Sequence, residues 1–328
     1  MTEEPLEGEP VRAGVIGVGT MGRHHARVYN ELTGAELVGV ADADEERAAS
    51  VAAEYGTTAY TQDELLARVD AVSVAVPTRF HAEVAHSAID AGVSLLLEKP
   101  FVRDPAVGER LCNRAEAAGV VLQVGHIERF NPVIPTLQRV LSDEQLISLD
   151  ARRLGPPVDR DTTDGVVLDL MIHDIDIVST LVGSPVADVS AVGAADGQRV
   201  SAQIEFESGV VATLSASRVT EKKVRDLAIT TEDCHVDIDY ADQQVEIHRH
   251  SLPEYVDDDG DLRYRHESVI ERPMVENGEP LKAELSSFLT SHRENEPPEI
   301  SGRDALETLR LARRIDESAT EPPRPARH

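Results

Sequence analysis

The sequence is poor in lysine, and this scarcity narrows what kind of protein it encodes. Among 328 residues, 60 are Asp or Glu and 32 are Lys or Arg, and the only lysines are Lys99, Lys222, Lys223 and Lys282. The formal net charge of −28 argues against a nucleic-acid partner, because binding to a polyanion needs a basic face. Many carboxylates with arginine in place of lysine predict a halophilic protein, since high salt screens self-repulsion; an ordinary acidic cytoplasmic protein is the alternative.

Cysteines and long apolar runs are scarce as well. Cys112 and Cys234 are the only cysteines, and they lie far apart, with neither metal-type spacing nor a disulfide framework. This usage fits a reducing cytoplasm, and we expect no metal site. No segment has the pattern of a signal peptide or the length of a membrane span, so we expect no membrane partner. The chain is long enough for two domains, each with its own core.

The glycine motif Gly17-x-Gly19-x-x-Gly22 follows the apolar run 11–16 and opens a helix-like segment. Gly17 allows a tight turn out of a strand, Gly19 lets the backbone approach a pyrophosphate, and Gly22 lets the helix pack closely on the sheet. The start of the helix then offers free N–H groups and a partial positive charge to phosphates. The pattern predicts a dinucleotide-binding loop, and a strand-turn-helix without a ligand is the alternative.

A carboxylate lies where such a loop needs one. The apolar run 37–41 ends at Asp42, twenty residues after Gly22, where it can accept hydrogen bonds from both hydroxyls of an adenosine ribose. Asp42 would repel the 2′-phosphate of NADP, and no basic residue lies among the residues 43–46 that follow it. We therefore expect NAD, rather than NADP, as the cofactor.

Short apolar runs alternate with amphipathic stretches in the first part of the chain. Strands that alternate with helices predict a parallel, doubly wound sheet, so we expect a Rossmann domain of the α/β class at residues 11–125. Residues 1–10 are acidic and should form a disordered arm. The expected strands are 11–16, 37–41, 71–76, 94–98 and 120–124, and the expected helices are 44–55, 62–68, 80–91 and 105–118, the last between Asp104 as N-cap and Gly119.

After Gly125 the pattern changes to consecutive strands. Strands joined by short turns predict an open, mostly antiparallel sheet, so we expect a C-terminal α/β domain at 126–317 for substrate binding and dimerisation, with a disordered tail at 318–328. The expected elements are a strand at 147–154, a helix at 166–181, strands from 186 to about 250 with tight turns at Ser208-Gly209 and Ala241-Asp242, a loop at 251–280, and helices at 280–293 and 304–317.

Glu98-Lys99-Pro100 ends one of the expected parallel strands. Ligands of doubly wound sheets bind outside the carboxyl ends of the strands, so Lys99 is placed to hydrogen-bond a substrate hydroxyl and favour its ionised form. Pro100 restricts the backbone of Lys99 to extended geometry, which aims the side chain. A solvated surface lysine is the alternative, and it is disfavoured in a chain with so few lysines.

Asp169, His173 and Asp176 have the spacing of one face of a helix. An imidazole can take a proton from a hydroxyl while a neighbouring carboxylate fixes its orientation, which makes His173 a candidate base. Carboxylates are common in this chain, so chance proximity is a serious alternative, and a metal site of His and Asp is a weaker one.

Polar residues also mark the junction between the two expected domains. His126, Arg129 and Asn131 lie there and are candidates to line a substrate cleft. Arg152 and Arg153, on the following strand, could grip a diphosphate, but they face opposite ways, so at most one of them points into a cleft. We assign Arg153 to the substrate; a solvated strand face is the alternative.

Four ordered motifs resemble the glucose-fructose oxidoreductase/inositol dehydrogenase/MocA family over nearly the whole chain, from Val11 to Ile315. They are Gly17-x-Gly19-x-x-Gly22-x-x-His25, Val76-Pro77-x-x-x-His81, Glu98-Lys99-Pro100 and Asp169-x-x-x-His173. The resemblance implies a Rossmann domain followed by an α/β domain whose open sheet forms a dimer or tetramer interface. It also implies reversible hydride transfer between NAD(P) and a carbinol carbon of a sugar or cyclitol.

The resemblance assigns roles to the matching residues. His173 would be the base, Lys99 its polar partner at the hydroxyl, and Asp169 an orienting or substrate-binding carboxylate. The implied cofactor contacts are Gly17, Gly19, Thr20, Met21, Gly22, Asp42, Pro77, His81, Glu98 and Lys99.

A narrower resemblance concerns three stretches, 124–132, 151–156 and 169–176, which look like those of archaeal UDP-N-acetylglucosamine 3-dehydrogenases. It implies oxidation at C3 of a UDP-linked amino sugar. We also expect a homodimer or homotetramer formed through the C-terminal sheet, as the family resemblance implies. A free-sugar or inositol dehydrogenase is the alternative among enzymes, because one fold serves many sugars. A sensor that binds NAD and a sugar without turnover is the alternative of another class.

Overall fold

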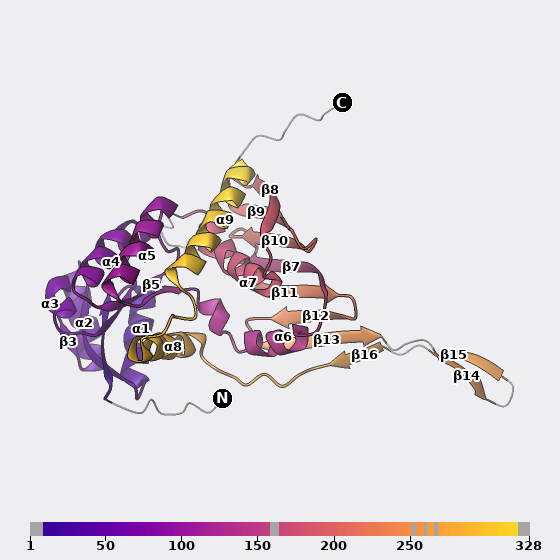
Figure 1. Ribbon diagram of the computed structural model, residues 1–328, viewed down its shortest axis with the longest axis horizontal. Coiled ribbons are helices and arrows are strands. Elements are labelled where there is room, and N and C mark those ends of the chain that lie inside the picture. Colours follow the sequence, from indigo (N-terminus) through magenta and orange to yellow (C-terminus); the bar gives the residue numbers. More distant parts are fainter. Residues whose placement is uncertain (1–8, 158–163, 251–253, 259–260, 266–267, 321–328) are drawn as a thin grey trace. The chain divides into compact units, whose positions relative to one another are not determined.

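The computed structural model describes residues 9–157, 164–250, 254–258, 261–265 and 268–320 (Figure 1). The chain forms two compact units. The first unit comprises Met1–Phe130 and Gly278–Arg310, and the second comprises Asn131–Asn277 and Leu311–His328. The segment 278–310, expected in the C-terminal domain, thus makes its contacts in the first unit. The arm expected at 1–10 lies outside the described residues except for its last two.

The first unit contains a parallel sheet, as predicted. Within the described residues it has six strands in the order β3-β2-β1-β4-β5-β6, and every pairing is parallel. The central strands are buried along their length, which explains why they are continuous apolar runs in the sequence. The strands are β1 (Val11–Ile16), β2 (Ala35–Ala41), β3 (Thr58–Ala59), β4 (Ala71–Val74), β5 (Ser94–Glu98) and β6 (Leu122–Gly125).

The helices of the first unit begin and end where local chemistry predicts. The Asp104 side chain accepts a hydrogen bond from the backbone N–H of Ala106, Pro105 takes the first helical position, and Gly119 ends the helix in the left-handed conformation. The helices are α1 (Thr20–Glu31), α2 (Glu45–Tyr55), α3 (Gln62–Leu66), η1 (Thr78–Phe80), α4 (His81–Asp90), α5 (Pro105–Ala118), η2 (Ile127–Phe130) and α8 (Pro280–Glu294).

Helix α8 completes the core of the first unit. Leu281, Leu285, Phe288 and Leu289 repeat at helical spacing and are buried in one cluster with Tyr29 and other residues of α1. Their burial explains why this helix belongs to the first unit although it follows the second sheet in the chain.

The second unit contains the predicted open sheet. Its eight strands, counted within the described residues, have the order β16-β13-β12-β11-β7-β10-β9-β8, and the β7–β10 pair is parallel while the others are antiparallel. The hairpins at Ser208-Gly209 and Ala241-Asp242 are confirmed. The strands are β7 (Leu146–Leu154), β8 (Val186–Ala194), β9 (Arg199–Phe206), β10 (Val211–Ser217), β11 (Val224–Thr231), β12 (Cys234–Asp239), β13 (Gln244–His250) and β16 (Ser268–Glu271).

The expectation of a loop at 251–280 is wrong for part of that range. Strands β14 (Glu254–Asp258) and β15 (Asp261–Arg265) pair with each other, and β16 joins the edge of the large sheet. β14 has the sequence EYVDD, which does not alternate, and β16 has only four residues, so neither gives a clear strand pattern; the alternation of β15, DLRYR, is confined to five residues. The remaining stretch up to α8 has no regular structure.

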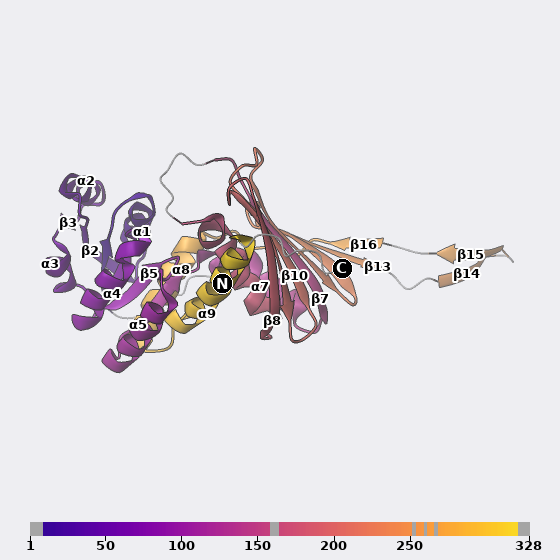
Figure 2. The same cartoon turned by 90° about the horizontal axis from the view of Figure 1, so that it is seen from above.

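Helices cover one face of this sheet. They are α6 (Val133–Leu141), η3 (Val167–Met171), α7 (Ile172–Val182) and the part of α9 (Gly302–Thr320) that follows Arg310. Figure 2 shows the sheet nearly edge-on with α7 against that face. Helix α9 runs three residues into the expected tail, whose remainder lies outside the described residues. Among the helices described, none is both long and apolar enough to cross a membrane.

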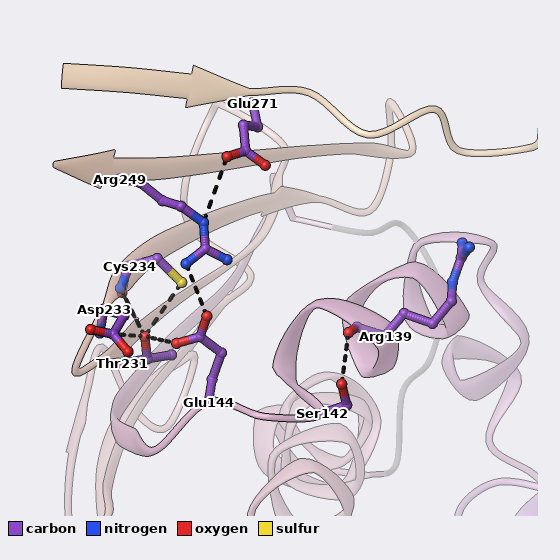
Figure 3. A network of polar contacts seen from close by, with 8 residues as sticks. All are labelled: Arg139, Ser142, Glu144, Thr231, Asp233, Cys234, Arg249 and Glu271. Carbon is purple, nitrogen blue, oxygen red and sulfur yellow. Dashed lines mark hydrogen bonds and ion pairs between the residues drawn. The ribbon is translucent and has the colours of Figure 1, made fainter. Parts of the chain in front are cut away.

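A polar network ties one end of this sheet to the connection between α6 and β7 (Figure 3). Glu144 accepts hydrogen bonds from Thr231 Oγ1 at 2.9 Å and from Arg249 Nη1 at 3.0 Å, and Arg249 also lies 3.7 Å from Glu271. Burial alone would raise the pKa of Glu144, but these two donors bring it below the usual value. Glu144 thus links β11 to β13, and Arg249 links β13 to Glu271 on β16.

Candidate active site

The glycine loop of the first unit has the geometry that its spacing predicts. Gly17 has φ +86°, and a Cβ atom there would lie 2.8 Å from the backbone of Ala75. A Cβ atom on Gly22 would lie 1.8 Å from the carbonyl oxygen of Gly17, whereas one on Gly19 would meet nothing within 4 Å. Gly17 and Gly22 therefore shape the loop, and Gly19 leaves open space beside it.

That open space lies at the start of α1. Gly19 is the N-cap and provides no side-chain hydrogen bond, so the first N–H groups of the helix are not capped by it. Uncapped N–H groups and the positive end of the helix dipole attract phosphate oxygens. The loop therefore fits the pyrophosphate of a dinucleotide.

Asp42, at the end of β2, is fixed against the same loop. One carboxylate oxygen accepts the backbone N–H of Val18 at 2.7 Å, and the other accepts that of Asp44 at 2.9 Å. A carboxylate offers about four acceptor positions, so capacity for ribose hydroxyls remains.

The expectation that no basic residue lies beside Asp42 is wrong. Arg47 Nη1 lies 3.3 and 3.4 Å from the two Asp42 oxygens. Asp44 caps α2 by accepting the N–H of Arg47, so the first turn of the helix brings the arginine back over the end of β2. Reading only the residues directly after Asp42 misses this turn.

His81 and Pro77 lie after β4. Pro77 is the N-cap of η1, and the buried His81 ring has Nε2 2.8 Å from the Val76 carbonyl oxygen. Its Nδ1 lies 3.1 Å from the carbonyl oxygens of both Pro100 and Phe101. Burial lowers the pKa of His81, which favours a neutral ring. His81 therefore joins the chain after β4 to the segment that follows Lys99.

Glu98 and Lys99 end β5. The Glu98 carboxylate is buried, lies 2.9 Å from His25 Nε2 on α1 and accepts the backbone N–H of Lys99 at 3.2 Å. Lys99 is half-buried, and its peptide bond to Pro100 is cis. The structure thus brings together His25 of the glycine motif and Glu98 of the Glu-Lys-Pro motif, a partnership that the separate motifs do not reveal.

In the second unit, the single helix expected at 166–181 begins differently. Residues Val167–Met171 form one turn of π-helix, η3, and α7 starts at Ile172. Asp169 lies in the π-turn and the half-buried His173 in the first turn of α7. Such turns recur at functional sites, and they leave no mark in the hydrophobic pattern.

Asp169 has a partner that the sequence did not suggest. Arg218, just after β10, is buried and donates from Nη2 to Asp169 Oδ2 at 2.6 Å and to the Asp164 carbonyl oxygen at 3.2 Å. The guanidinium therefore fixes the orientation of the carboxylate that the sequence motif places one turn before His173.

Arg153 is committed to a buried ion pair. Its guanidinium donates to Asp174 at 2.7 and 3.0 Å, and both residues are 3% exposed. The neighbouring Arg152 points the other way, with 61% of its side chain exposed, and pairs with Asp226. The opposite orientation of the two arginines is confirmed, and Arg153 joins β7 to the turn of α7 that carries His173.

The remaining expected site residues lie at the end of the first unit and the start of the second. His126 is buried directly after β6, and Arg129 is half-buried in η2. Asn131 donates to the Tyr240 carbonyl oxygen at 3.2 Å and accepts the N–H of Val133 at 3.3 Å, which stabilises the start of α6. Among the residues that the structure describes, no group of three or more His, Cys, Asp or Glu side chains could hold a metal ion.

Comparisons with known proteins agree with this architecture. Two family models match, "Oxidoreductase family, NAD-binding Rossmann fold" over residues 11–126 and "Oxidoreductase family, C-terminal alpha/beta domain" over residues 156–323. The scyllo-inositol 2-dehydrogenase (NAD(+)) of Bacillus subtilis is 29% identical over 240 residues, which cover 64% of this chain and 68% of that protein.

A UDP-N-acetylglucosamine 3-dehydrogenase from Acidithiobacillus ferrooxidans is 36% identical over 310 residues, covering 90% of this chain and 94% of that protein. A solved structure of that enzyme, GnnA, superposes with a TM-score of 0.87 over 95% of this chain and 98% of the other, at 34% identity. A levoglucosan dehydrogenase in complex with NADH and levoglucosan has a TM-score of 0.81 at 20% identity, over 95% of this chain and 97% of the other, and shares the fold.

Proposed function

Because this chain belongs to the glucose-fructose oxidoreductase/inositol dehydrogenase/MocA family of NAD-binding oxidoreductases, we propose that it oxidises the C3 hydroxyl of UDP-N-acetylglucosamine. The observation that carries the substrate is the 36% identity to a UDP-N-acetylglucosamine 3-dehydrogenase over 90% of the chain. The inositol dehydrogenases match at lower identity and over less of the chain, which makes an inositol or free sugar the second candidate substrate.

Bound NAD would accept the hydride of the carbinol carbon, and the protein residues would bind the substrates and move the hydroxyl proton. The glycine loop and the start of α1 hold the pyrophosphate, with Thr20 and Met21 beside it, and Asp42 holds the ribose. His173 takes the hydroxyl proton, and the ammonium of Lys99 stabilises the oxygen as its negative charge develops. The products are a 3-keto sugar, NADH and one proton.

The supporting residues act on these groups. Arg218 holds Asp169, which we assign to the orientation of His173 or to the substrate. We assign to substrate binding the residues His126, Arg129 and Asn131. We assign to the cofactor side of Lys99 the residues Pro77, His81 and Glu98. Arg153 is buried against Asp174, so we assign it to holding α7 rather than to gripping a diphosphate.

We further propose a halophilic, cytoplasmic homodimer or homotetramer that uses the sheet face opposite α7. Two observations support this assignment. Within the described residues no helix covers that face, which leaves it open to a second copy of the chain. Cys112 and Cys234 are free and buried, as suits a reducing compartment.

Absorbance of NADH tests the reaction. In molar KCl with NAD⁺, UDP-N-acetylglucosamine should produce NADH, with inositol, free sugars and NADP⁺ as parallel arms. His173→Ala and Lys99→Met should each lower kcat/KM by about 10²- to 10⁴-fold while NADH binding, followed by fluorescence, is retained. Lys222→Met, at an exposed lysine, is the matched control and should leave kcat/KM unchanged.

The other outcomes separate the alternatives. If only inositols or free sugars react, the oxidoreductase assignment stands and the UDP-sugar assignment is wrong. If no substrate reacts and the protein is shown to be free of tightly bound NADH, the sensor alternative replaces the dehydrogenase. A Lys99→Met variant with full activity would remove that lysine from the mechanism.

A further inference from the structure

Glu284 is a fully buried carboxyl group without a role in the proposed mechanism. It lies on α8 between Leu281 and Leu285, is 0% exposed, and neither of its oxygens has a hydrogen-bond partner among the described residues. An ionised carboxylate in such a place would lose its hydration and gain nothing in return. The group must therefore carry a proton or obtain a cation, and no arginine or lysine of the described chain is bonded to it.

Among the described residues, the polar groups around the Glu284 carboxyl lack a hydrogen-bond donor, not an acceptor. Gln123 of β6 is also fully buried, and its Nε2 lies 3.5 Å from the backbone oxygen of Glu284. The Gln123 Oε1 atom has no hydrogen-bond donor in the described structure. A proton on Glu284 supplies the kind of group that this place lacks, since a carboxylic acid donates where a carboxylate only accepts.

The nearby buried anion is Glu98. It accepts hydrogen bonds from the backbone N–H of Lys99 and pairs with His25, and these partners lower its pKa although burial raises it. Burial and then the charge of Glu98 raise the pKa of Glu284 well above its usual range. Two buried carboxyl groups in one place do not both ionise, so the two take different protonation states.

Other ionisable groups near Glu284 lie on α1 and η2. Tyr29 on α1 is buried and bonded to Ser73 of β4 at 2.8 Å, and burial raises its pKa, so it stays neutral. η2 also packs against α8 and carries Glu128 and Arg129, which are half-buried. We call His25, Glu98, Gln123 and Glu284 the Glu98 cluster.

We propose that Glu284 is a positioning residue for Lys99: as a neutral carboxylic acid, it leaves Glu98 as the one anion of the cluster, bound to His25 and to the Lys99 backbone. The inference rests on the proposed function for the role of Lys99. When alkaline pH removes the proton from Glu284, its negative charge repels the Glu98 carboxylate. The contacts of Glu98 with His25 and with the Lys99 backbone then weaken, and Lys99 is held less firmly. Glu284→Gln cannot ionise, so it should keep the arrangement at high pH.

The protonation state is tested without any substrate. At neutral pH, infrared spectra should show the carbonyl stretch of a protonated carboxylic acid that disappears in Glu284→Gln and persists in Glu294→Gln, an exposed position on the same helix. A raised folded-state pKa stabilises the fold below the unfolded value of about 4.3, and this stability is lost as pH rises toward the folded pKa. The melting temperature of Glu284→Gln relative to wild type should therefore rise with pH, while that of Glu294→Gln should not.

The positioning role is tested on the enzyme. Glu284→Gln should keep kcat within about twofold at neutral pH and move the alkaline limb of the kcat profile upward by about one pH unit or more. Glu98→Gln should lower kcat at every pH. An absent carboxylic-acid band together with a constant melting difference overturns the proton on Glu284. An unmoved alkaline limb overturns the positioning role.

Failure of the substrate assignment is distinguishable from failure of this inference. The infrared and melting measurements read Glu284 whichever sugar is oxidised. If UDP-N-acetylglucosamine is not a substrate but these two measurements agree with a proton on Glu284, the kinetic test moves to the sugar that reacts.

Discussion

The two units bury charge in different ways. In the second unit two carboxylates beside His173 face arginines, the half-buried Asp169 with Arg218 at 2.6 Å and the buried Asp174 with Arg153 at 2.7 Å. In the first unit Glu98 faces a histidine and a backbone N–H, and the Glu284 carboxyl has no hydrogen-bond partner where the structure describes the chain. The buried carboxyl groups of the first unit therefore have no arginine partner of the kind that Asp169 and Asp174 have in the second unit, within the part of the chain that the structure describes.

This difference predicts which unit responds to pH. Arginine does not lose its proton in proteins, so the pairs around His173 keep their charges until their carboxylates are protonated in acid. In the first unit, burial and then the charge of Glu98 raise the pKa of Glu284 well above its usual range, so this carboxyl group ionises only as the pH rises. Alkaline pH is therefore expected to act on the first unit, through Glu284.

The largest effect should come from breaking the backbone geometry of the first unit. Gly22→Ala would place a methyl group 1.8 Å from the Gly17 carbonyl oxygen, and neither backbone segment can move without disturbing β1 and α1. We expect a loss of about 4 kcal/mol or more of stability and no measurable NAD binding. Urea unfolding and NADH fluorescence measure the two effects.

Gly19→Ala is the matched control for that substitution. Its methyl group meets no atom within 4 Å, and the backbone has φ −67°, which alanine adopts freely. Stability should change by less than about 0.5 kcal/mol, while NAD affinity falls roughly 10-fold or more because the methyl group occupies space meant for the pyrophosphate. Equal stability losses at Gly19 and Gly22 would contradict the steric account of the loop.

Local rules for tight turns and helix ends explain why most helices and strands of the first unit can be predicted from the sequence. Gly22, Asp104 and Gly119 act within one loop or one helix end, and the structure confirms the elements they mark. Partners across the fold carry no such local signal. Arg218 is separated from Asp169 by 49 residues and His25 from Glu98 by 73, and nothing in either motif indicates the other.

Other parts were predicted only coarsely, for physical reasons. The π-turn at Val167–Met171 alters helical geometry without altering the apolar pattern, so the sequence showed an ordinary helix. Strands β14 to β16 have only four or five residues each, and β14 does not alternate, so the pattern they leave in the sequence is short and weak. Helix α8 was recognised as a helix, but its placement in the first unit depends on packing against α1, which spacing does not encode.

A buried ion pair in the second unit should give the next largest effect. Arg153→Met leaves the Asp174 carboxylate buried without its cation, which should cost about 3–5 kcal/mol of stability, and Arg153→Met/Asp174→Leu should recover most of it. Arg152→Met, on the same strand but with an exposed side chain, should cost less than about 1 kcal/mol. Urea titrations of the three variants give the comparison.

The same variants distinguish an effect of the ion pair on catalysis from its effect on stability. If Arg153→Met/Asp174→Leu regains stability but kcat stays low, the pair orients the turn that carries His173. If kcat returns with stability, the pair only holds the fold. Equal costs for Arg152→Met and Arg153→Met would contradict the view that buried pairs hold the second unit.

The smallest effect is expected at an ion pair of the first unit, where an arginine faces a carboxylate as in the second unit. Asp42 and Arg47 form a pair at the ribose end of the glycine loop, with 8% and 46% of their side chains exposed. Asp42→Ser removes the charge that repels a 2′-phosphate and releases Arg47 to meet it, so the ratio of kcat/KM for NADP to that for NAD should rise about tenfold, or about 1.4 kcal/mol. Asp42→Ser/Arg47→Ala should raise this ratio less, and Arg47→Ala alone should leave NAD kinetics within about twofold.

If the single and double variants shift the preference equally, Arg47 does not reach the phosphate, and the repulsion by Asp42 alone sets the choice of cofactor. If Asp42→Ser changes neither ratio, the carboxylate serves the loop through its bonds to Val18 and Asp44 and does not read the ribose.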